Sequence, residues 1–263
     1  MPFGVKRAEW ILDMKIIAII PARMAATRFP GKPLANILGL PMIEHVRRRV
    51  SLCDVLDEVI VATCDEDIKD VVEKAGGKVV MTADCHERCT DRVAEAAASV
   101  DADVIINVQG DEPLVLPEMM VDATRPIKNS PEIAAVNLVT RIFDDEEFNN
   151  PNAPKVVTNR LGNLLYISRE PIPSNKKATS MDYLKLKQLG IIAFRSDFLH
   201  TFTKLAPTPL EQTESVDMMR AVEHGYQVRI VETKGLMIGV DVPEDIDLAE
   251  AALVSDSLLD KYM

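Results

Sequence analysis

Three cationic side chains lie within ten residues of one another, directly after a predicted strand. The apolar run Ile16–Ile20 ends at a proline, and the loop that follows carries Arg23, Arg28 and Lys32 beside Gly31. A strand followed by a basic, glycine-containing loop lets an α/β protein present backbone N–H groups and fixed cations to a chain of phosphates. A solvated surface loop is the alternative. We favour phosphate binding because this cluster stands out in a chain whose net charge is −11.

Two apolar segments in other parts of the chain each end at an aspartate. Asp111 follows the predicted strand Asp103–Val108, and Asp241 follows a second predicted strand, Met237–Val240. If these two strand ends meet in space, their carboxylates offer the hard oxygen ligands that Mg²⁺ takes when phosphates supply the rest. Capping of the last helix, just before Pro243, is the alternative role for Asp241.

The remaining polar candidates leave their roles open. Arg169, at the end of a predicted strand, is suited to binding a carboxylate or to a structural ion pair. Glu211 and Gln212 open a predicted helix, where they serve either as partners of the helix dipole or as ligands of sugar hydroxyls. Three histidines are expected on or near helix surfaces (His45, His200 and His224).

Composition excludes several classes of protein. The 263 residues contain 30 Lys and Arg against 41 Asp and Glu, a balance that argues against general nucleic-acid binding. No apolar run approaches the roughly 18 residues that a membrane span needs, and residues 1–13 lack the features of a secretory signal. The phosphate-binding pattern Gly-x4-Gly-Lys-Ser/Thr and the dinucleotide-binding pattern Gly-x-Gly-x-x-Gly are both absent. We therefore expect a cytoplasmic protein with no membrane or nucleic-acid partner.

Four cysteines occur, and Cys85 and Cys89 are the only close pair. Their spacing lies within the range of zinc-ligand pairs, but no second pair of Cys or His follows, so reduced cytosolic thiols are the favoured interpretation.

Strand and helix patterns alternate along the first half of the chain, which predicts a mostly parallel central sheet with helices on both faces. Predicted strands cover residues 15–20, 58–63, 78–81, 103–108, 133–139, 155–159, 163–168, 188–194, 227–231 and 237–240. Predicted helices cover residues 41–51, 66–75, 90–100, 117–126, 211–224 and 243 to about 259, with Thr90 as the N-cap of the third. The C-terminal half is expected to be a β-rich extension of one domain, residues 14–263, behind an N-terminal extension of residues 1–13.

Ligands of such sheets bind outside the carboxyl ends of the strands. The loops at residues 21–33, 82–90 and 109–113 all leave predicted strand ends. We therefore expect them to converge on one crevice.

Several segments in order resemble the 3-deoxy-manno-octulosonate cytidylyltransferases, the CMP-KDO synthetases. They lie at residues 20–34, 39–43, 61–65, 107–113, 150–157, 166–173, 209–214 and 239–245. The resemblance implies a Rossmann-like nucleotidyltransferase fold, a homodimer, and the reaction of CTP with a 2-keto-3-deoxy sugar acid to give the CMP-sugar and pyrophosphate, with Mg²⁺ as cofactor.

The resemblance also implies roles for individual residues. Arg23, Lys32, Asp111 and Asp241 are expected to be catalytic, with the two aspartates holding the metal. The nucleotide would be bound by Ala22, Arg23, Arg28, Lys32, Arg88, Thr90 and Asp91. The sugar acid would be bound by Gln109, Arg169, Gln188, Glu211 and Gln212.

Three departures from the family pattern concern the substrates. The base-reading loop usually contains Ser-Gly where this chain has Arg88-Cys89, a sugar-facing His is replaced by Gln188, and a frequent aromatic residue is replaced by Ser174. Nucleotidyl transfer remains the predicted activity, but the acceptor is open to a related ulosonic acid or another anionic molecule. The rival interpretations are a sugar-1-phosphate nucleotidyltransferase and a nucleotide-sensing module that does not turn CTP over.

Overall fold

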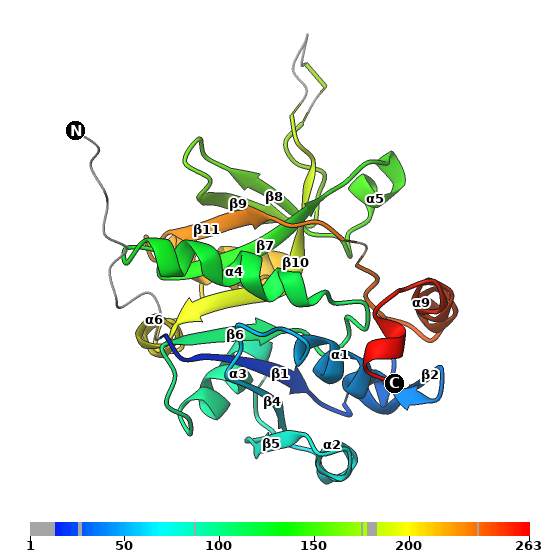
Figure 1. Ribbon diagram of the computed structural model, residues 1–263. Coiled ribbons are helices and arrows are strands. Elements are labelled where there is room, and N and C mark those ends of the chain that lie inside the picture. The colour runs from blue at the N-terminus through cyan, green and yellow to red at the C-terminus, as the bar shows by residue number, and fades with distance from the viewer. Residues whose placement is uncertain (1–13, 26–27, 87, 175, 178–182, 236) are drawn as a thin grey trace, which may run out of the picture.

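The computed structural model describes residues 14–25, 28–86, 88–174, 176–177, 183–235 and 237–263. Helices pack on both sides of one central sheet (Figure 1). The N-terminal extension predicted for residues 1–13 lies outside the described residues.

Seven strands run side by side in the order β11-β7-β10-β6-β1-β4-β5. All of them are mutually parallel except β10, which runs antiparallel to both β6 and β7. Their bounds are β1 Ile16–Ala22, β4 Glu58–Thr63, β5 Lys78–Met81, β6 Val104–Val108, β7 Ala135–Arg141, β10 Leu186–Arg195 and β11 Val228–Glu232. The predicted mostly parallel sheet is confirmed, and the expected β-rich extension proves to be a continuation of that sheet beyond β6.

A hairpin of β8 (Lys155–Thr158) and β9 (Leu164–Ser168) pairs with one end of β10. A short pair, β2 (Asn36–Ile37) and β3 (Leu40–Pro41), forms a separate two-stranded sheet after the basic loop. The basic loop itself ends in a 3₁₀ turn, η2 (Lys32–Leu34), which follows Gly31 in the left-handed conformation at φ 75°.

The helices form two layers because the strands are apolar on both faces. Along β1, Ile16, Ala18 and Ile20 face one core cluster, whereas Ile17 and Ile19 face the other. The first cluster is covered by α1 (Met42–Val50), α2 (Glu66–Lys74) and α4 (Pro117–Asn129). The second is covered by α3 (Cys89–Ala97), α6 (Ser196–Phe202) and α8 (Met218–Glu223).

A third, smaller cluster joins the basic-loop region to the C-terminal helix α9 (Asp245–Val254). In Figure 1, α9 lies beside β2 at one end of the sheet. His45 is fully buried here, 2.9 Å from the Tyr262 hydroxyl and 2.8 Å from the Ile37 carbonyl oxygen. The expectation that His45 lies at a helix surface is therefore wrong, because the C-terminal tail folds back over α1.

Three predicted elements differ from the structure. Residues 237–240 form no strand: Val240 is buried, and its N–H donates to the Asp111 carbonyl at 2.9 Å. The predicted helix 211–224 is two helices, α7 (Pro209–Glu214) and α8, because Ser215 adopts the left-handed conformation at φ 55°. The last helix begins at Asp245 rather than Pro243 and ends at Val254, and a 3₁₀ turn, η3 (Leu259–Lys261), follows it.

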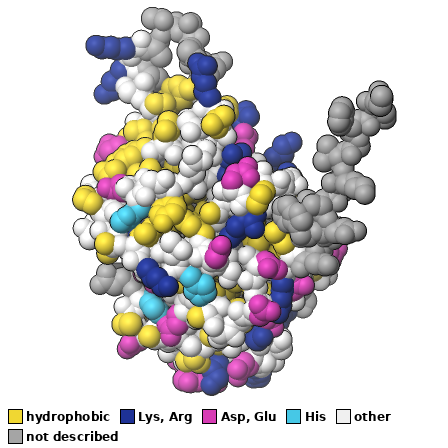
Figure 2. Space-filling view, turned by 90° about the vertical axis from the view of Figure 1, so that its left-hand side faces the viewer, with side chains coloured by type: hydrophobic (Ala, Val, Ile, Leu, Met, Phe, Trp, Pro, Cys, Tyr) yellow, Lys and Arg dark blue, Asp and Glu magenta, His cyan; other side chains and the backbone are white. Residues whose placement is uncertain are grey.

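Two short helices have no counterpart among the predictions, namely α5 (Asp145–Asn149) and α6. Figure 2 shows a face on which basic and acidic side chains are interspersed and hydrophobic side chains gather beside histidines. Within the described residues, no helix has both the length and the apolar character that a bilayer crossing requires.

Candidate active site

The three loops predicted to converge do converge. A cavity of about 520 Å³ lies at the carboxyl ends of β1 and β6. Its walls come from the basic loop, from the N-terminus of α3, and from the turn after β6. The predicted residues that line it are Ala22, Arg23, Arg28, Lys32, Arg88, Gln109, Asp111, Arg169 and Asp241.

Lys32 joins the two predicted metal ligands at the centre of this cavity. Its Nζ lies 2.7 Å from Asp111 Oδ2 and 3.6 Å from Asp241 Oδ1. The ammonium group is mostly enclosed, since the Lys32 side chain is 13% exposed. Segments at least 79 residues apart in the sequence thus place a cation beside two carboxylates. Oxygen donors already gathered around a positive charge are a suitable donor set for Mg²⁺.

Asp241 is free of the helix-capping role that the sequence left open. The Asp245 carboxylate accepts hydrogen bonds from the backbone N–H groups of Asp241 and Val242, at 2.7 and 3.0 Å, so Asp245 holds this loop. The Asp241 side chain points to the cations instead, with Arg28 Nη2 at 3.0 Å from its Oδ1.

Arg23 also lines this cavity and is exposed, and its Nη1 donates to the His86 carbonyl oxygen, in the loop before α3, at 3.4 Å. The cations and the aspartates therefore line one space, and a polyphosphate placed there meets several positive charges.

A second cavity of about 350 Å³ adjoins the first and shares Arg88, Cys89, Gln109, Asp111, Arg169 and Ser215 with it. Gln109 and Gln188, two of the predicted sugar ligands, line this side, and Arg169 borders both cavities. Gly190 is required here because a Cβ at that position would come within 2.3 Å of Gln109 Cγ. The absence of a side chain at Gly190 thus sets the position of Gln109.

The second cavity has a polar lining that the sequence did not reveal. Gln188 Nε2 donates to Asn137 Oδ1 at 2.6 Å. Asn107, on β6, is fully buried, and in the part of the chain that the structure describes neither amide atom of its side chain has a hydrogen-bond partner. Burial, followed by the charge of Asp111, raises the pKa of Glu112 to about 7.

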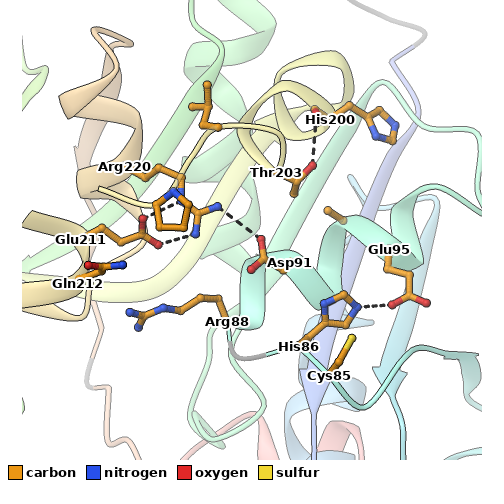
Figure 3. A pocket seen from close by; sticks show the side chains of 13 residues that line it. Cys85, His86, Arg88, Asp91, Glu95, His200, Thr203, Glu211, Gln212 and Arg220 are labelled. Atoms are coloured by element: carbon orange, nitrogen blue, oxygen red, sulfur yellow. Dashed lines mark hydrogen bonds and ion pairs between the residues drawn. The ribbon is translucent and has the colours of Figure 1, made fainter. Parts of the chain in front are cut away.

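Glu211 and Gln212, the other predicted sugar ligands, lie elsewhere. Both line a separate pocket of about 620 Å³, shown in Figure 3, with His86 and Asp91. Glu211 is buried, and both of its carboxylate oxygens accept hydrogen bonds from Arg220. Burial alone would raise the pKa of Glu211, but the hydrogen bonds and charge of Arg220 lower it overall. The structure thus shows Glu211 in a structural ion pair and does not bring it to the central cavity.

Two residues predicted to bind the nucleotide also have other neighbours. Thr90 does not cap α3: Arg88 occupies the N-cap position, and the Thr90 hydroxyl donates to Asp217 Oδ2 at 2.6 Å. Thr90 and Asp217 line the second cavity. Asp91 lies 3.6 Å from Arg220 Nη1 and lines the pocket of Figure 3.

Ser215 and Asp217 were missed because the predicted continuous helix would place them on a regular helical surface. In the structure, the break at Ser215 turns both residues toward the active site. No pattern in the sequence marks a serine as left-handed, although the segment 213–216 contains three residues of modest helix propensity.

The structure places the cysteine pair predicted as the less favoured zinc candidate beside the first cavity and the pocket of Figure 3. Cys85 and Cys89 are both exposed, and among the described residues there is no cluster of three or more potential metal-ligating side chains. Cys89 borders the active-site cavity, and solvent in the cavity reaches it.

The comparisons with known proteins agree with this geometry. Residues 17–235 match the family model described as cytidylyltransferase. The chain is 46% identical to the 3-deoxy-manno-octulosonate cytidylyltransferase of Geobacter metallireducens over 89% of its own length and 96% of the relative's. It belongs to the 3-deoxy-manno-octulosonate cytidylyltransferase family. The enzyme of that name from Syntrophotalea carbinolica is 45% identical, over 91% of this chain and 99% of the relative.

Solved structures place the cytidylyltransferase chain in the same fold. A CMP:2-keto-3-deoxy-manno-octonic acid synthetase complexed with CTP superimposes with a TM-score of 0.85 at 36% identity, over 91% of this chain and 98% of that one. A putative glucose-1-phosphate thymidylyltransferase from Bacillus anthracis superimposes with a TM-score of 0.66 at 16% identity, which shows the shared fold alone. The predicted family and the predicted Rossmann-like nucleotidyltransferase fold are thus confirmed.

Proposed function

We propose that this protein activates 3-deoxy-D-manno-octulosonate with CTP, giving the CMP-sugar and pyrophosphate for the synthesis of lipopolysaccharide or a related surface glycan. The observation that carries the proposal is the position of Lys32 between Asp111 and Asp241 in the first cavity, with Asp111 also lining the adjoining second cavity. The first cavity is rich in cations and suits a nucleoside triphosphate, and it is called the nucleotide-side cavity. The second cavity is polar and suits a sugar acid, and it is called the acceptor-side cavity.

In the proposed reaction the anomeric hydroxyl of the sugar acid attacks the α-phosphorus of CTP in line. A bond forms between that oxygen and the α-phosphorus, the bond from the α-phosphorus to the bridging oxygen breaks, and the hydroxyl proton leaves to solvent. Such transfers need little covalent work from the protein, which aligns the reactants and neutralises charge. We assign neutralisation of the departing pyrophosphate to Arg23, Arg28 and Lys32.

The cofactor of this reaction is proposed to be Mg²⁺. Asp111 and Asp241 fit it, because their oxygens share one cationic neighbour and the cavity leaves room for phosphate oxygens to complete the coordination. When bound, Mg²⁺ would polarise the α-phosphoryl group and lower the pKa of the attacking hydroxyl. Lys32 lies beside both aspartates, and we propose that it also contacts the phosphates of bound CTP.

For the sugar acid we propose contacts from Gln109 and Gln188, with Arg169 at the border of the two cavities. Arg169 is fixed by its donors: Nε reaches the Glu214 carbonyl oxygen at 2.8 Å and Nη1 reaches the Pro151 carbonyl oxygen at 2.9 Å. The positive charge of Arg169 makes the electrostatic potential of the cavity more positive. Its hydrogen bond to the Glu214 carbonyl oxygen joins the end of β9 to the break between α7 and α8.

A related ulosonic acid is the second candidate acceptor. The Gln188 amide lines the acceptor-side cavity and donates to Asn137. This wall therefore offers an amide where the family pattern has the imidazole of a histidine. A hydroxyl pattern other than that of the manno-octulosonate is compatible with such a wall.

Pyrophosphate release tests the proposal. Purified protein is mixed with Mg²⁺, each of the four common nucleoside triphosphates, and a panel of acceptors that includes 3-deoxy-D-manno-octulosonate, other ulosonic acids and sugar-1-phosphates. We expect release with CTP and the octulosonate. Release only with a sugar-1-phosphate would refute the acceptor class, and calorimetric CTP binding without release under any acceptor would favour the nucleotide-sensing interpretation.

The family resemblance further supports two proposals that concern the whole molecule. We propose a homodimer in the cytoplasm, where both CTP and reduced thiols are found. Light scattering on the purified protein tests the dimer, since a monomer at micromolar concentration would contradict it.

A further inference from the structure

Arg88 occupies a singular position among the side chains of the active site. It borders the nucleotide-side cavity, the acceptor-side cavity and the pocket of Figure 3. The family pattern that the sequence resembles has a serine at this position, whereas this chain has a cation. In Figure 3, the Arg88 side chain extends from the start of α3 away from the His86–Glu95 pair.

Within the described residues, the side-chain hydrogen bond and the ion pair of Arg88 join it to the break between α7 and α8. Its Nη1 donates to Ser215 Oγ at 2.8 Å, and its Nε lies 3.8 Å from Asp217 Oδ1. Asp217 lines the acceptor-side cavity but not the nucleotide-side one. The Asp217 carboxylate accepts a hydrogen bond from Thr90 and attracts the Arg88 guanidinium toward the acceptor-side cavity. The other N–H groups of the guanidinium are then left to bind a ligand in that cavity.

A second guanidinium approaches the same residue from the other side. Arg169 Nη2 lies 3.5 Å from the Ser215 carbonyl oxygen, so Ser215 stands between two arginines. The donors of Arg169 are directed at backbone carbonyl oxygens, whereas the Arg88 side chain is 27% exposed and makes one hydrogen bond within the described residues. A guanidinium has five N–H donors, so within the described residues Arg88 has more of them left for a ligand than Arg169, which makes three hydrogen bonds.

We propose that Arg88 recognises the carboxylate of the sugar-acid acceptor and is a specificity-determining residue of this enzyme. The inference rests on the proposed function and adds a ligand to it that the family pattern does not contain. An arginine fork matches a planar carboxylate with two parallel hydrogen bonds, and the fixed charge of Arg169 adds attraction from the far side of Ser215. This assignment moves Arg88 from the nucleotide, where the sequence placed it, to the acceptor.

Steady-state kinetics of Arg88→Ser, Arg88→Lys and wild type test the proposal, with CTP and 3-deoxy-D-manno-octulosonate as substrates. We expect the KM for the octulosonate to rise about 10- to 100-fold in Arg88→Ser, the range for a lost hydrogen bond between charged groups. Arg88→Lys should recover only part of this loss, and the KM for CTP should stay within about threefold of wild type. Arg125→Ser, which removes an exposed arginine paired with Asp122, is the matched control.

A carboxamide analogue of the acceptor identifies the group that Arg88 contacts. Wild type should bind the analogue about as poorly as Arg88→Ser binds the acid, and Arg88→Ser should distinguish acid from amide far less than wild type does. Equal losses for acid and amide in the variant, an unchanged KM for the acid, or a rise confined to the KM for CTP would each overturn the inference while leaving the cytidylyltransferase intact. No wild-type turnover with the octulosonate would overturn the proposed function, and this inference with it.

Discussion

Replacing Lys32 with methionine separates the charge of its side chain from its packing. Methionine keeps a flexible apolar stem of similar length and removes the ammonium, whose Nζ lies 2.7 Å from Asp111 and 3.6 Å from Asp241. The Lys32 side chain is 13% exposed, so water replaces little of the lost interaction. Two carboxylates then remain close together with Arg28 as the remaining cation beside Asp241.

The expected loss can be estimated from both roles of the ammonium. As one donor to a departing pyrophosphate, it should supply a factor of about 10² to 10³ in turnover, or about 2.7–4 kcal/mol of transition-state stabilisation. In the resting enzyme the gross attraction to Asp111 is roughly 6 kcal/mol at an effective dielectric constant of 20, and desolvation and solvent screening reduce it severalfold. Removing the ammonium should therefore tighten Mg²⁺ binding to the nucleotide-free protein even as turnover falls.

Two measurements on Lys32→Met check this reasoning, namely pyrophosphate release at saturating substrates and calorimetric titration of Mg²⁺ without CTP. Lys69→Met is the matched control, because Lys69 lies on α2 away from the cavity, its side chain is 31% exposed, and within the described residues its ion pair is with Glu66 of the same helix. Turnover within threefold of wild type would show that Lys32 does not act on the phosphates. Loss of turnover with weaker Mg²⁺ binding would show that the lysine does not compete for the metal position.

Three further perturbations follow from the structure. Asp241→Asn should raise the Mg²⁺ concentration for half-maximal turnover at least about tenfold, and an unchanged requirement would remove Asp241 from the metal site. Burial lowers the pKa of His45, so the unfolded state binds a proton at this imidazole at a higher pH than the folded state does. The unfolding free energy should therefore fall as the pH drops below about 6.5. Urea midpoints at pH 5 and pH 7.5 measure this fall, which should be smaller in His45→Gln. Asn107→Leu should leave the melting temperature unchanged or higher, since it removes a buried amide with no partner in the described residues. Asn137→Leu should lower the unfolding free energy by about 1–3 kcal/mol, because both atoms of that amide make hydrogen bonds. A lower melting temperature for Asn107→Leu would contradict the absence of a partner.

The strands of the sheet were predictable because their residues are apolar on both faces. The predicted bounds of β4 and β5 agree with the structure residue for residue, and those of β6 differ by one. Such runs have few ways to hide their side chains other than a buried parallel sheet. The position of the cavity followed from the same reasoning, since parallel strands deliver their loops to one edge.

Errors arose where a few tertiary contacts outweighed local preference. The segment 237–240 is apolar enough for a strand, yet it packs Val240 into a small core and pairs through one backbone hydrogen bond with Asp111. The break at Ser215 has no local cause in the sequence. Its surroundings include Arg88 and Arg169, both of which bond to Ser215.

Glu211 shows how a residue type can mislead when its partner is unknown. An acidic residue in the first turn of a helix after Pro209 is compatible with a ligand, a dipole partner or an ion pair. Only the fold brings Arg220, nine residues later, against both of its oxygens, and this contact becomes possible because the chain turns back between α7 and α8.

The sequence by itself determined the family, the sheet, and most of the charged groups that line the first cavity, because all of these depend on local patterns: apolar runs that end in loops, three cations in ten residues, and carboxylates at segment ends. The tertiary structure alone decided which side chains line the second cavity. That choice depends on the antiparallel course of β10 beside β6, on the glycine that sets Gln109, and on a left-handed serine that turns Asp217 toward Arg88. These are relations between distant segments, and their energies come from contacts that no single stretch of the chain contains.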